Sequence, residues 1–301
     1  MPRRGGPIEK RPVPNVKRVV AVASGKGGVG KSTIAVNLAT ALALLPTRPR
    51  VGLLDLDVFG PSVPRLMGLE RADEPRLTDD GAMIPLTNHG LPCMSIGFLL
   101  PRPPAPPSAS PDTELPPTNE DTPIVWRGLM VQKAVQQLLF DVDWREELGS
   151  GKGQGLDVLV LDMPPGTGDV PLTLGQLVVV DGAVIVSTPQ DVALADVRKG
   201  VSMFRKISVP ITGIVLNESY FTCPSCTDRH QLFGSPDSFR ATATRLGVDV
   251  LGELPLVPMV SEASDRGVPY MLSRSGVSGS DEWSASMARI AGDVWKSLKL
   301  A

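Results

Sequence analysis

The sequence predicts an α/β domain built on a doubly wound, mainly parallel β-sheet. Short runs rich in β-branched residues alternate with segments of helix length along most of the 301 residues. These runs are apolar at nearly every position, which is typical of strands buried on both faces of a parallel sheet. A glycine-rich segment lies between the first run and the first helix. These observations predict one domain.

The strands are expected where the apolar runs are shortest and richest in Val, Ile and Leu. In chain order they are Val19–Ala23, Val51–Asp55, Leu156–Asp162, Gly182–Ser187, Ile211–Asn217 and Val248–Leu251. The helices are expected in the longer segments that follow or separate these strands. In chain order they are Lys31–Leu45, Gly128–Val142, Val192–Ile207, Pro236–Leu246 and Asp281–Leu298.

The domain is expected to span residues 18–301. Residues 1–17 are basic, rich in Pro and Gly, and have no apolar core, so they do not resemble a secretory signal and are expected to form a flexible lead. Residues 101–123 hold nine of the 30 prolines. This insertion is expected to be a disordered surface segment, and we favour a spacer over a docking site.

Composition excludes several classes of protein. The formal net charge is -2 with acids and bases intermixed, which argues against nucleic-acid binding and a polybasic membrane patch. No apolar run is long enough to span a bilayer, so stable membrane insertion is not expected. Three cysteines make no disulfide framework, which favours a reducing compartment, and two histidines exclude a multi-histidine metal site.

Residues 24–33 read SGKGGVGKST and contain the phosphate-binding pattern G-x-x-x-x-G-K-[ST]. Such a loop presents successive backbone N–H groups to an anion, and the following helix adds its dipole. Lys31 is expected to reach the terminal phosphates of a nucleotide and the Ser32 hydroxyl to coordinate Mg²⁺. The residues expected to hold the nucleotide are Gly25, Gly27, Gly28, Val29, Gly30, Lys31, Ser32 and Thr33.

Lys26 is a second lysine that this pattern does not require. It stands too early in the loop to reach its own terminal phosphates easily, so we interpret it as acting on the nucleotide of a second subunit. There it would stabilise charge that develops on the phosphates during transfer, as an arginine finger does. A solvated loop lysine is the alternative.

Carboxylates follow two of the predicted strands. Asp55 and Asp57 stand two positions apart in LLDLDVFGPS, and Asp162 closes the apolar strand in LVLDMPPGTGD. An Asp at the end of a buried strand suits a residue that binds Mg²⁺ through a coordinated water. The glycine-rich turn after Asp162 is suited to sensing a γ-phosphate and moving on hydrolysis.

These three motifs in this order resemble the deviant Walker A ATPases of the MinD/Mrp class. The resemblance implies that Lys26 acts in trans, that Asp57 orients the attacking water and contributes to the Mg²⁺ site, and that Asp162 is the Walker B residue. It also implies that Asn217, at the end of a later strand, contacts adenine. No N-K-x-D guanine motif is present, so ATP is favoured over GTP.

Cys223 and Cys226 have the C-x-x-C spacing of two ligands to one metal or cluster. A reactive redox pair is the alternative, although its usual helical context is missing. Because a metal site needs about four ligands, a symmetric dimer in which each subunit gives two thiolates is the economical solution. His230 is a possible third ligand but is interpreted as a loop histidine, and Cys93 as a buried apolar residue.

The C-x-x-C loop, placed at residues 219–234, resembles the Mrp/NUBPL group of Fe–S carrier ATPases, as does the segment LGELPLVPMVSEASDRGVPY. The resemblance runs from Val19 to Tyr270 and is closest to the mitochondrial NUBPL branch, which is implicated in complex I assembly. Three features depart from the family pattern. Glu218 follows Asn217 where the family has Met, the Pro-rich insertion is extra, and no mitochondrial presequence is recognised.

This resemblance implies an ATPase that carries a [4Fe–4S] cluster at a homodimer interface and delivers it to apo-proteins, with slow hydrolysis of Mg²⁺-bound ATP. Complex I subunits are the expected recipients, and the mitochondrial matrix is the expected compartment by resemblance, otherwise the cytoplasm. Two alternatives remain open. One is a MinD/ParA-like positioning switch, and the other is an ATPase interaction module stapled by zinc.

Overall fold

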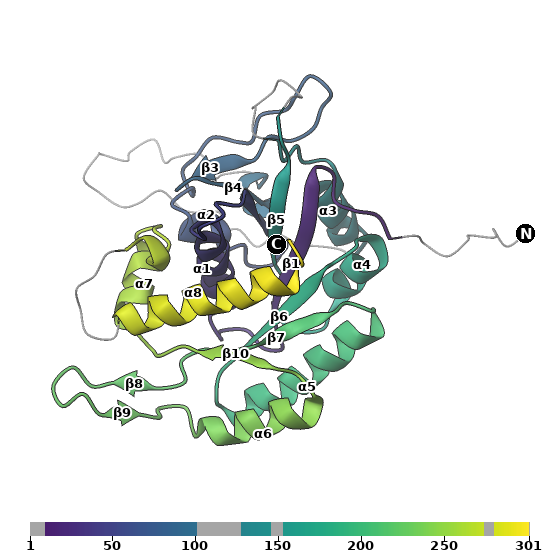
Figure 1. Cartoon of the computed structure of the whole chain (residues 1–301). Helices are drawn as coiled ribbons and strands as arrows, with labels where there is room; N and C mark the ends of the chain where they lie inside the picture. Colours follow the sequence, from purple (N-terminus) through teal and green to yellow (C-terminus); the bar gives the residue numbers. More distant parts are fainter. Residues whose placement is uncertain (1–9, 101–127, 146–152, 274–279, 301) are drawn as a thin grey trace, which may run out of the picture.

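The computed structural model describes residues 10–100, 128–145, 153–273 and 280–300, and the account below concerns these residues. The chain forms one eight-stranded sheet in the order β10-β7-β6-β1-β5-β2-β4-β3 (Figure 1). All neighbouring pairs are parallel except β3 and β4, which form an antiparallel hairpin at one edge. The predicted doubly wound, mainly parallel sheet is confirmed.

The predicted strands are all present, with small shifts at their ends. Their bounds are β1 Val16–Ser24, β2 Val51–Asp55, β5 Leu156–Asp162, β6 Gly182–Ser187, β7 Ile211–Leu216 and β10 Val250–Glu253. The residues of β2 and β6 are buried throughout. Strands without an exposed face are expected in a sheet covered by helices on both sides, which explains their unbroken apolar pattern.

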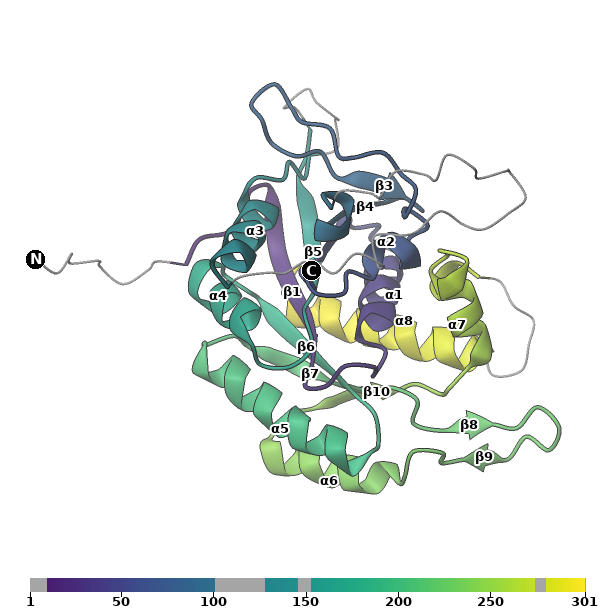
Figure 2. The same cartoon turned by 180° about the vertical axis from the view of Figure 1, so that it is seen from behind.

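The predicted helices are confirmed to within two residues at each end. They are α1 Lys31–Ala43, α3 Gly128–Phe140, α5 Asp191–Lys206, α6 Pro236–Leu246 and α8 Ser280–Ser297. Helices α1 and α8 pack together on one face of the sheet, and α3, α4 (Asp169–Leu177) and α5 cover the other (Figures 1 and 2). The apolar core therefore lies in two layers around a central sheet.

Several elements were not predicted. They are α2 Val63–Leu66, β3 Leu86–Asn88, β4 Leu91–Ser95, α4, α7 Pro258–Asp265 and the hairpin of β8 Phe221–Thr222 and β9 Arg229–His230. They are short or interrupted by Pro and Gly, so their periodicity is weak. Strand β4 holds Cys93, which is fully buried, and burial strongly raises the pKa of its thiol. Cys93 is thus confirmed as an apolar core residue.

The described part of the segment expected to be a flexible lead packs against the domain. The backbone of Arg11 exchanges hydrogen bonds with Leu177 and Val179, and its guanidinium lies 3.7 Å from the centre of the Phe140 ring. Val13 is buried and β1 begins at Val16. The Pro-rich insertion 101–123 and residues 1–9 lie outside the described residues.

The parallel arrangement decides where the predicted site residues gather. Strands β1, β2, β5, β6 and β7 all run the same way, so their carboxyl ends meet along one edge of the sheet. Asp55 pairs directly with Asp162 in the register of β2 and β5. None of the helices in the described residues combines the length and apolarity that crossing a bilayer requires.

Candidate functional site

The glycine-rich loop joins the end of β1 to the start of α1. Gly28 and Gly30 have φ values of 78° and 80°, a left-handed conformation that glycine adopts without strain. A Cβ on Gly30 would lie 2.4 Å from Nδ2 of Asn217, and a Cβ on Gly25 would lie 2.4 Å from Cβ of Asp196 in α5. Neighbouring elements thus hold the loop so closely that only glycine fits at both positions.

A cavity of about 240 Å³ opens at this loop. Its wall includes Gly27, Gly28 and the segment 30–33 on one side, and Asp57 and Ser62 on the other. The N-terminus of α1 faces it, so the backbone N–H groups and the dipole of this helix favour an anion there. The cavity has the lining expected for the phosphates of a nucleotide.

Lys31 is the cation at the centre of this site. Its side chain is only 7% exposed, and its ammonium forms an ion pair with Asp162. The same nitrogen lies 3.1 Å from Oγ of Ser32 and 3.9 Å from Oδ2 of Asp57. The structure therefore brings Lys31, Ser32, Asp57 and Asp162 together.

Three carboxyl groups surround this single ammonium, and two of them hold their protons unusually tightly. Burial, reinforced by the charge of Asp162, raises the pKa of Asp55 to about 8. Burial also raises the pKa of Asp57, although Lys31 opposes the shift. Carboxyl groups thus outnumber the cation where these strands end, and the charge of Asp162 adds to the effect of burial on both pKa values.

This excess of carboxylates fits a divalent cation. Oδ2 of Asp162 is buried and has no hydrogen-bond partner among the described residues. An unsatisfied buried carboxylate oxygen beside a hydroxyl and a second carboxylate is the hard oxygen donor set that Mg²⁺ prefers. Ser32, Asp57 and Asp162 are the residues suited to hold it, directly or through water.

Asp55 has a role that the sequence did not reveal. Its carboxyl group accepts hydrogen bonds from the backbone N–H of Asp57 at 2.9 Å and of Val63 at 3.1 Å. It also accepts one from the Ser95 hydroxyl at 3.0 Å. Asp55 therefore fixes the turn that carries Asp57. The D-x-D spacing was the available signal, but only the fold shows that the first Asp faces the backbone.

Lys26 stands apart from these groups. Its residue is exposed, and its backbone carbonyl accepts a hydrogen bond from the Ser24 hydroxyl at 2.8 Å. It is not among the residues that line the cavity. Within one chain, the second lysine of the loop is therefore directed to the surface rather than to the site beside Lys31.

Asn217 lies directly after β7 and is 7% exposed. Its amide Nδ2 donates a hydrogen bond to the carbonyl oxygen of Val29 at 2.9 Å, which ties the end of β7 to the phosphate loop. Glu218 follows with φ of 54°, a strained conformation for a residue with a side chain. Cys223 is only six positions beyond Asn217.

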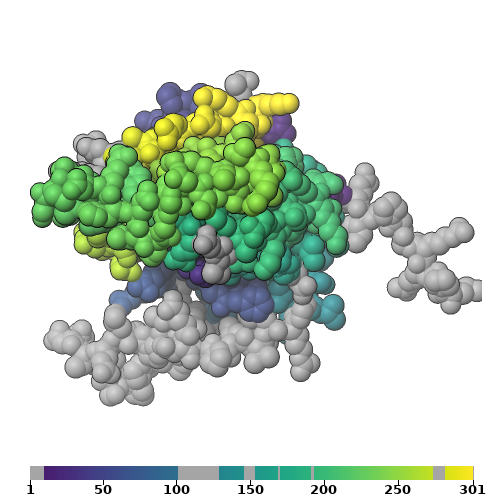
Figure 3. Space-filling model, turned by 90° about the horizontal axis from the view of Figure 1, so that it is seen from below, coloured from purple at the N-terminus to yellow at the C-terminus, as the bar shows by residue number. Residues whose placement is uncertain are grey.

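The C-x-x-C pair lies in the turn of the β8–β9 hairpin, which projects from the body of the domain (Figures 1 and 3). Cys223 is half-buried, Cys226 is exposed, and both are free thiols. Backbone N–H groups of Cys226 and Ser225 lower the pKa of Cys223. For Cys226, the backbone N–H of Asp228 lowers the pKa, but the hydrogen bond to Cys223, burial and the side chain of Asp228 together outweigh it, so the pKa is raised overall.

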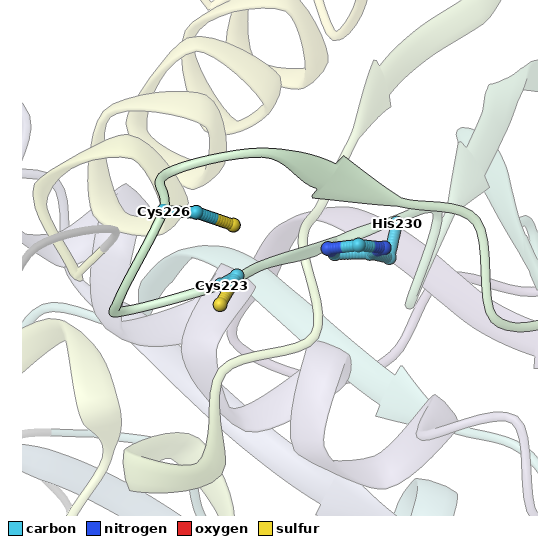
Figure 4. Close-up of side chains that lie close together, drawn as sticks. All are labelled: Cys223, Cys226 and His230. Carbon is cyan, nitrogen blue, oxygen red and sulfur yellow. The ribbon is translucent and has the colours of Figure 1, made fainter.

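His230 lies with the two thiols. One ligand atom from each of Cys223, Cys226 and His230 can be chosen so that all three lie within 4.8 Å of one another (Figure 4). The sequence alone favours a loop histidine at this position, whereas in the structure it belongs to β9 and faces the thiols. The position of His230 beside the thiols follows from the pairing register of β8 and β9. Because each of these strands has only two residues, their register cannot be predicted from the sequence.

The base of the hairpin is held by polar contacts to α8. The Tyr220 hydroxyl donates a hydrogen bond to Glu282 at 2.6 Å, and Arg229 forms an ion pair with the same carboxylate at 2.7 Å. The Arg229 guanidinium also lies 4.5 Å from the centre of the Tyr220 ring. These contacts between distant segments were not predicted.

Comparison with known proteins gives one matching family model, ParA, described as NUBPL iron-transfer P-loop NTPase, over residues 15–107 and 113–294. The mouse iron-sulfur cluster transfer protein NUBPL is 48% identical over 296 residues, which are 98% of this chain and 82% of the mouse protein. The Arabidopsis thaliana iron-sulfur protein required for NADH dehydrogenase, mitochondrial, is 45% identical over 90% of this chain and 77% of its own.

Among solved structures, a nucleotide-binding protein from Archaeoglobus fulgidus is similar. It is described as a complex with ADP, with Co found by PIXE. It is 33% identical to this chain, with a TM-score of 0.65, and the match covers 85% of this chain and 88% of that one. The predicted fold class and family resemblance are both confirmed by these findings.

The raised pKa of Asp55 predicts a pH-dependent stability in the nucleotide-free protein. Asp55 binds its proton more tightly when folded, with a pKa of about 8, than at its ordinary value of 3.8. Its contribution to the free energy of unfolding is therefore fully present below about pH 4 and is lost as the pH rises through 8. In Asp55→Asn the side chain is neutral at every pH. The free energy of unfolding, measured by urea denaturation, should therefore fall less steeply between pH 5 and 8 than in the wild type.

Asp143→Asn is the matched control, because the Arg145 hydrogen bond lowers the pKa of Asp143. Its effect on the pH dependence lies below pH 4, so the slope between pH 5 and 8 should stay as in the wild type. An Asp55→Asn variant with the wild-type slope would contradict the assignment of the proton to Asp55.

Asn217→Ala removes the hydrogen bond that holds Val29, so we expect the phosphate loop to bind every nucleotide less tightly. Calorimetry should show affinities for ATP and GTP that fall by similar factors, about tenfold for one buried hydrogen bond. The control is Ser219→Ala, two positions after Asn217, which loses a hydrogen bond to Glu253 instead. This variant should bind ATP and GTP as the wild type does. A loss confined to ATP would instead mark the adenine contact that the family resemblance implies.

Proposed function

Because the chain belongs to the ParA/NUBPL family of iron-transfer P-loop NTPases, we propose that it is an ATP-binding carrier of iron–sulfur clusters. Its cargo is a [4Fe–4S] cluster held by Cys223 and Cys226 and delivered to apo-proteins. The observation that carries the proposal is the pair of free thiols on a projecting hairpin that continues directly from the residue fixing the phosphate loop. The two relatives above are named for iron–sulfur transfer and for NADH dehydrogenase, so complex I subunits are the proposed recipients.

The nucleotide is proposed to be ATP, bound along Gly25, Gly27, Gly28, Val29, Gly30, Lys31, Ser32 and Thr33. The Lys31 ammonium would move partly away from Asp162 toward the terminal phosphates. The phosphates would then supply the negative charge that the Asp162 carboxylate supplies in the ion pair. Mg²⁺ at Ser32, Asp57 and Asp162 would neutralise the carboxylates that one lysine leaves in excess. Asp57, fixed by Asp55, would orient the attacking water.

A homodimer is proposed because two separate features are incomplete in one chain. Lys26 is exposed and does not line its own cavity, which suits a role at the phosphates of a second subunit. The C-x-x-C pair supplies two thiolates where a [4Fe–4S] cluster takes four, so a two-fold axis near the hairpin would complete the site.

The two sites are proposed to act on one another through the chain segment between them. Asn217 contacts the carbonyl of Val29 in the phosphate loop, and Cys223 follows after a short segment that includes the strained Glu218. A loop that moves on nucleotide binding or hydrolysis would therefore pull directly on the base of the hairpin. Slow ATP hydrolysis would then change the hold on the cluster.

Other assignments complete the proposal. The chain is proposed to act as one ATPase domain that begins before residue 18, because Arg11 and Val13 pack against it and β1 begins at Val16, with the insertion 101–123 as a spacer. The mitochondrial matrix is the proposed compartment, because the Arabidopsis relative is named as mitochondrial and as required for NADH dehydrogenase. A positioning switch leaves the thiols without a role, and a zinc staple does not account for the names of the relatives.

Lys26→Ala tests catalysis in trans. We expect it to bind ATP as the wild type does but to lose hydrolysis by at least about 100-fold, because charge on the phosphates develops only in the transition state. Lys31→Ala should lose both binding and hydrolysis. Calorimetry and single-turnover hydrolysis measure the two effects separately.

Lys296→Ala, an exposed lysine near the end of α8, is the matched control and should behave as the wild type. Normal hydrolysis by Lys26→Ala would remove the in-trans role. Hydrolysis recovered by mixing Lys26→Ala with a nucleotide-binding-deficient Lys31→Ala chain would support it, because one mixed site then receives an intact Lys26.

Cys223→Ser tests the cargo site. Anaerobic iron–sulfur reconstitution of the wild type should give about four irons per dimer and the broad visible absorption of a [4Fe–4S] cluster. Cys223→Ser should lose both, whereas Cys93→Ala, which changes a buried core thiol, should keep both. A colourless wild-type protein that holds zinc would contradict the carrier function and leave a nucleotide switch with a stapled loop.

A further inference from the structure

The register of the β8–β9 hairpin places Cys223 and His230 on the same face. Phe221 pairs with His230 and Thr222 with Arg229. The next pair outward is closed by the backbone N–H of Cys223, which donates to the carbonyl of Asp228 at 2.9 Å. Because successive side chains in a strand alternate between faces, Cys223 shares a face with Phe221 and therefore with His230. The two are diagonal neighbours, within reach of a thiol and an imidazole.

Cys226 completes the group from the turn. Thr227 has φ of 62° and its N–H donates to the carbonyl of Cys223 at 2.9 Å, which folds the turn back on itself. The Cys226 side chain thus points toward the other two side chains (Figure 4). Ligand atoms of Cys223, Cys226 and His230 lie within 4.8 Å of one another. Small rotations of these side chains would shorten this separation to the distance between two ligand atoms of a tetrahedral metal site.

The donor set selects a class of ion. Two thiolates and one neutral imidazole carry two negative charges, which a divalent cation balances. Thiolate and imidazole ligands suit ions of intermediate softness with tetrahedral geometry, such as Zn²⁺, Fe²⁺ and Co²⁺, and disfavour Mg²⁺ and Ca²⁺. Cys226 and His230 are exposed, so such an ion would exchange with solution without the hairpin opening.

From this geometry we propose that His230 is a third metal ligand, so that a single chain binds one divalent transition-metal ion at Cys223, Cys226 and His230 without a second copy. The inference rests on the proposed function, because the two thiols proposed to hold the cluster are also two of the three ligands. It adds a form of the protein, a single chain with one bound metal ion, that the shared cluster site does not require. One subunit has three ligands and an open fourth position, which a water or an incoming donor fills.

This state gives His230 a definite place in cluster handling. When two chains share a cluster through four thiolates, the imidazole is displaced. In a separate chain it supplies the third donor to one divalent metal ion, beside Cys223 and Cys226. His230 is therefore a residue of the single-subunit form, and it acts on a metal ion rather than on the nucleotide.

Cobalt(II) titration of the reduced, metal-free full chain under anaerobic conditions tests the proposal. Wild type should bind one cobalt per chain, remain monomeric by analytical ultracentrifugation, and develop the intense d–d bands of a tetrahedral thiolate site. His230→Ala should weaken cobalt affinity by at least about tenfold, since even outer-sphere partners of metal ligands cost that much. Gln231→Ala, the exposed neighbour on the chain, is the control and should bind as the wild type.

The wild-type protein also supplies an internal test that needs no substitution. It has two histidines, and Nε2 of His89 is engaged by the carbonyl oxygen of Gly267 at 2.8 Å. In a ¹⁵N–¹H spectrum of the imidazoles, one equivalent of Zn²⁺ should shift the ring nitrogens of His230 and leave those of His89 in place. A purely structural role for His230 predicts no such shift.

Two results would overturn the inference. One is cobalt at one ion per two chains in a dimer whose affinity is the same in His230→Ala, which would indicate a shared four-thiolate site. The other is zinc that binds without shifting His230. Neither result contradicts the proposed carrier function. That function is tested separately, by iron–sulfur reconstitution of the wild type and of Cys223→Ser.

Discussion

The balance of charge around Lys31 is the constraint on which the nucleotide site depends. Asp162 and Asp57 lie beside this ammonium, and Asp55 is packed behind them with its pKa raised to about 8. Because one cation does not neutralise three buried carboxyl groups, burial raises the pKa of Asp55 and of Asp57 despite the charge of Lys31. The parallel register of β2 and β5 creates this crowding, because it sets Asp55 directly beside Asp162.

The phosphate loop is held from outside as well as from within. Asn217 fixes the carbonyl of Val29, and the approach of Asn217 and of Asp196 leaves room only for glycine at positions 30 and 25. The loop is therefore packed between the ends of β7 and α5 rather than free in solvent. One of these neighbours, Asn217 at the end of β7, stands six positions before Cys223 in the chain.

The hairpin combines a fixed base with an accessible tip. Glu282 binds both Tyr220 and Arg229, so the hairpin is tied to α8 even though its own ladder is only two pairs long. The two thiols lie beyond this anchor, and His230 stands next to Arg229 in β9, where Cys226 and His230 are exposed. Such an arrangement suits a cargo that must be both held and released.

The sequence by itself determined the six central strands, five helices, the phosphate loop and the C-x-x-C pair, because unbroken apolar runs and fixed spacings are local signals. Tertiary structure alone decided what those residues contact. Asp55 became a support for Asp57, Asn217 a brace for Val29, and His230 a neighbour of two thiols, each through partners brought together by strand register. Register is set by packing across the whole sheet and by turn geometry, so no single segment of sequence records it.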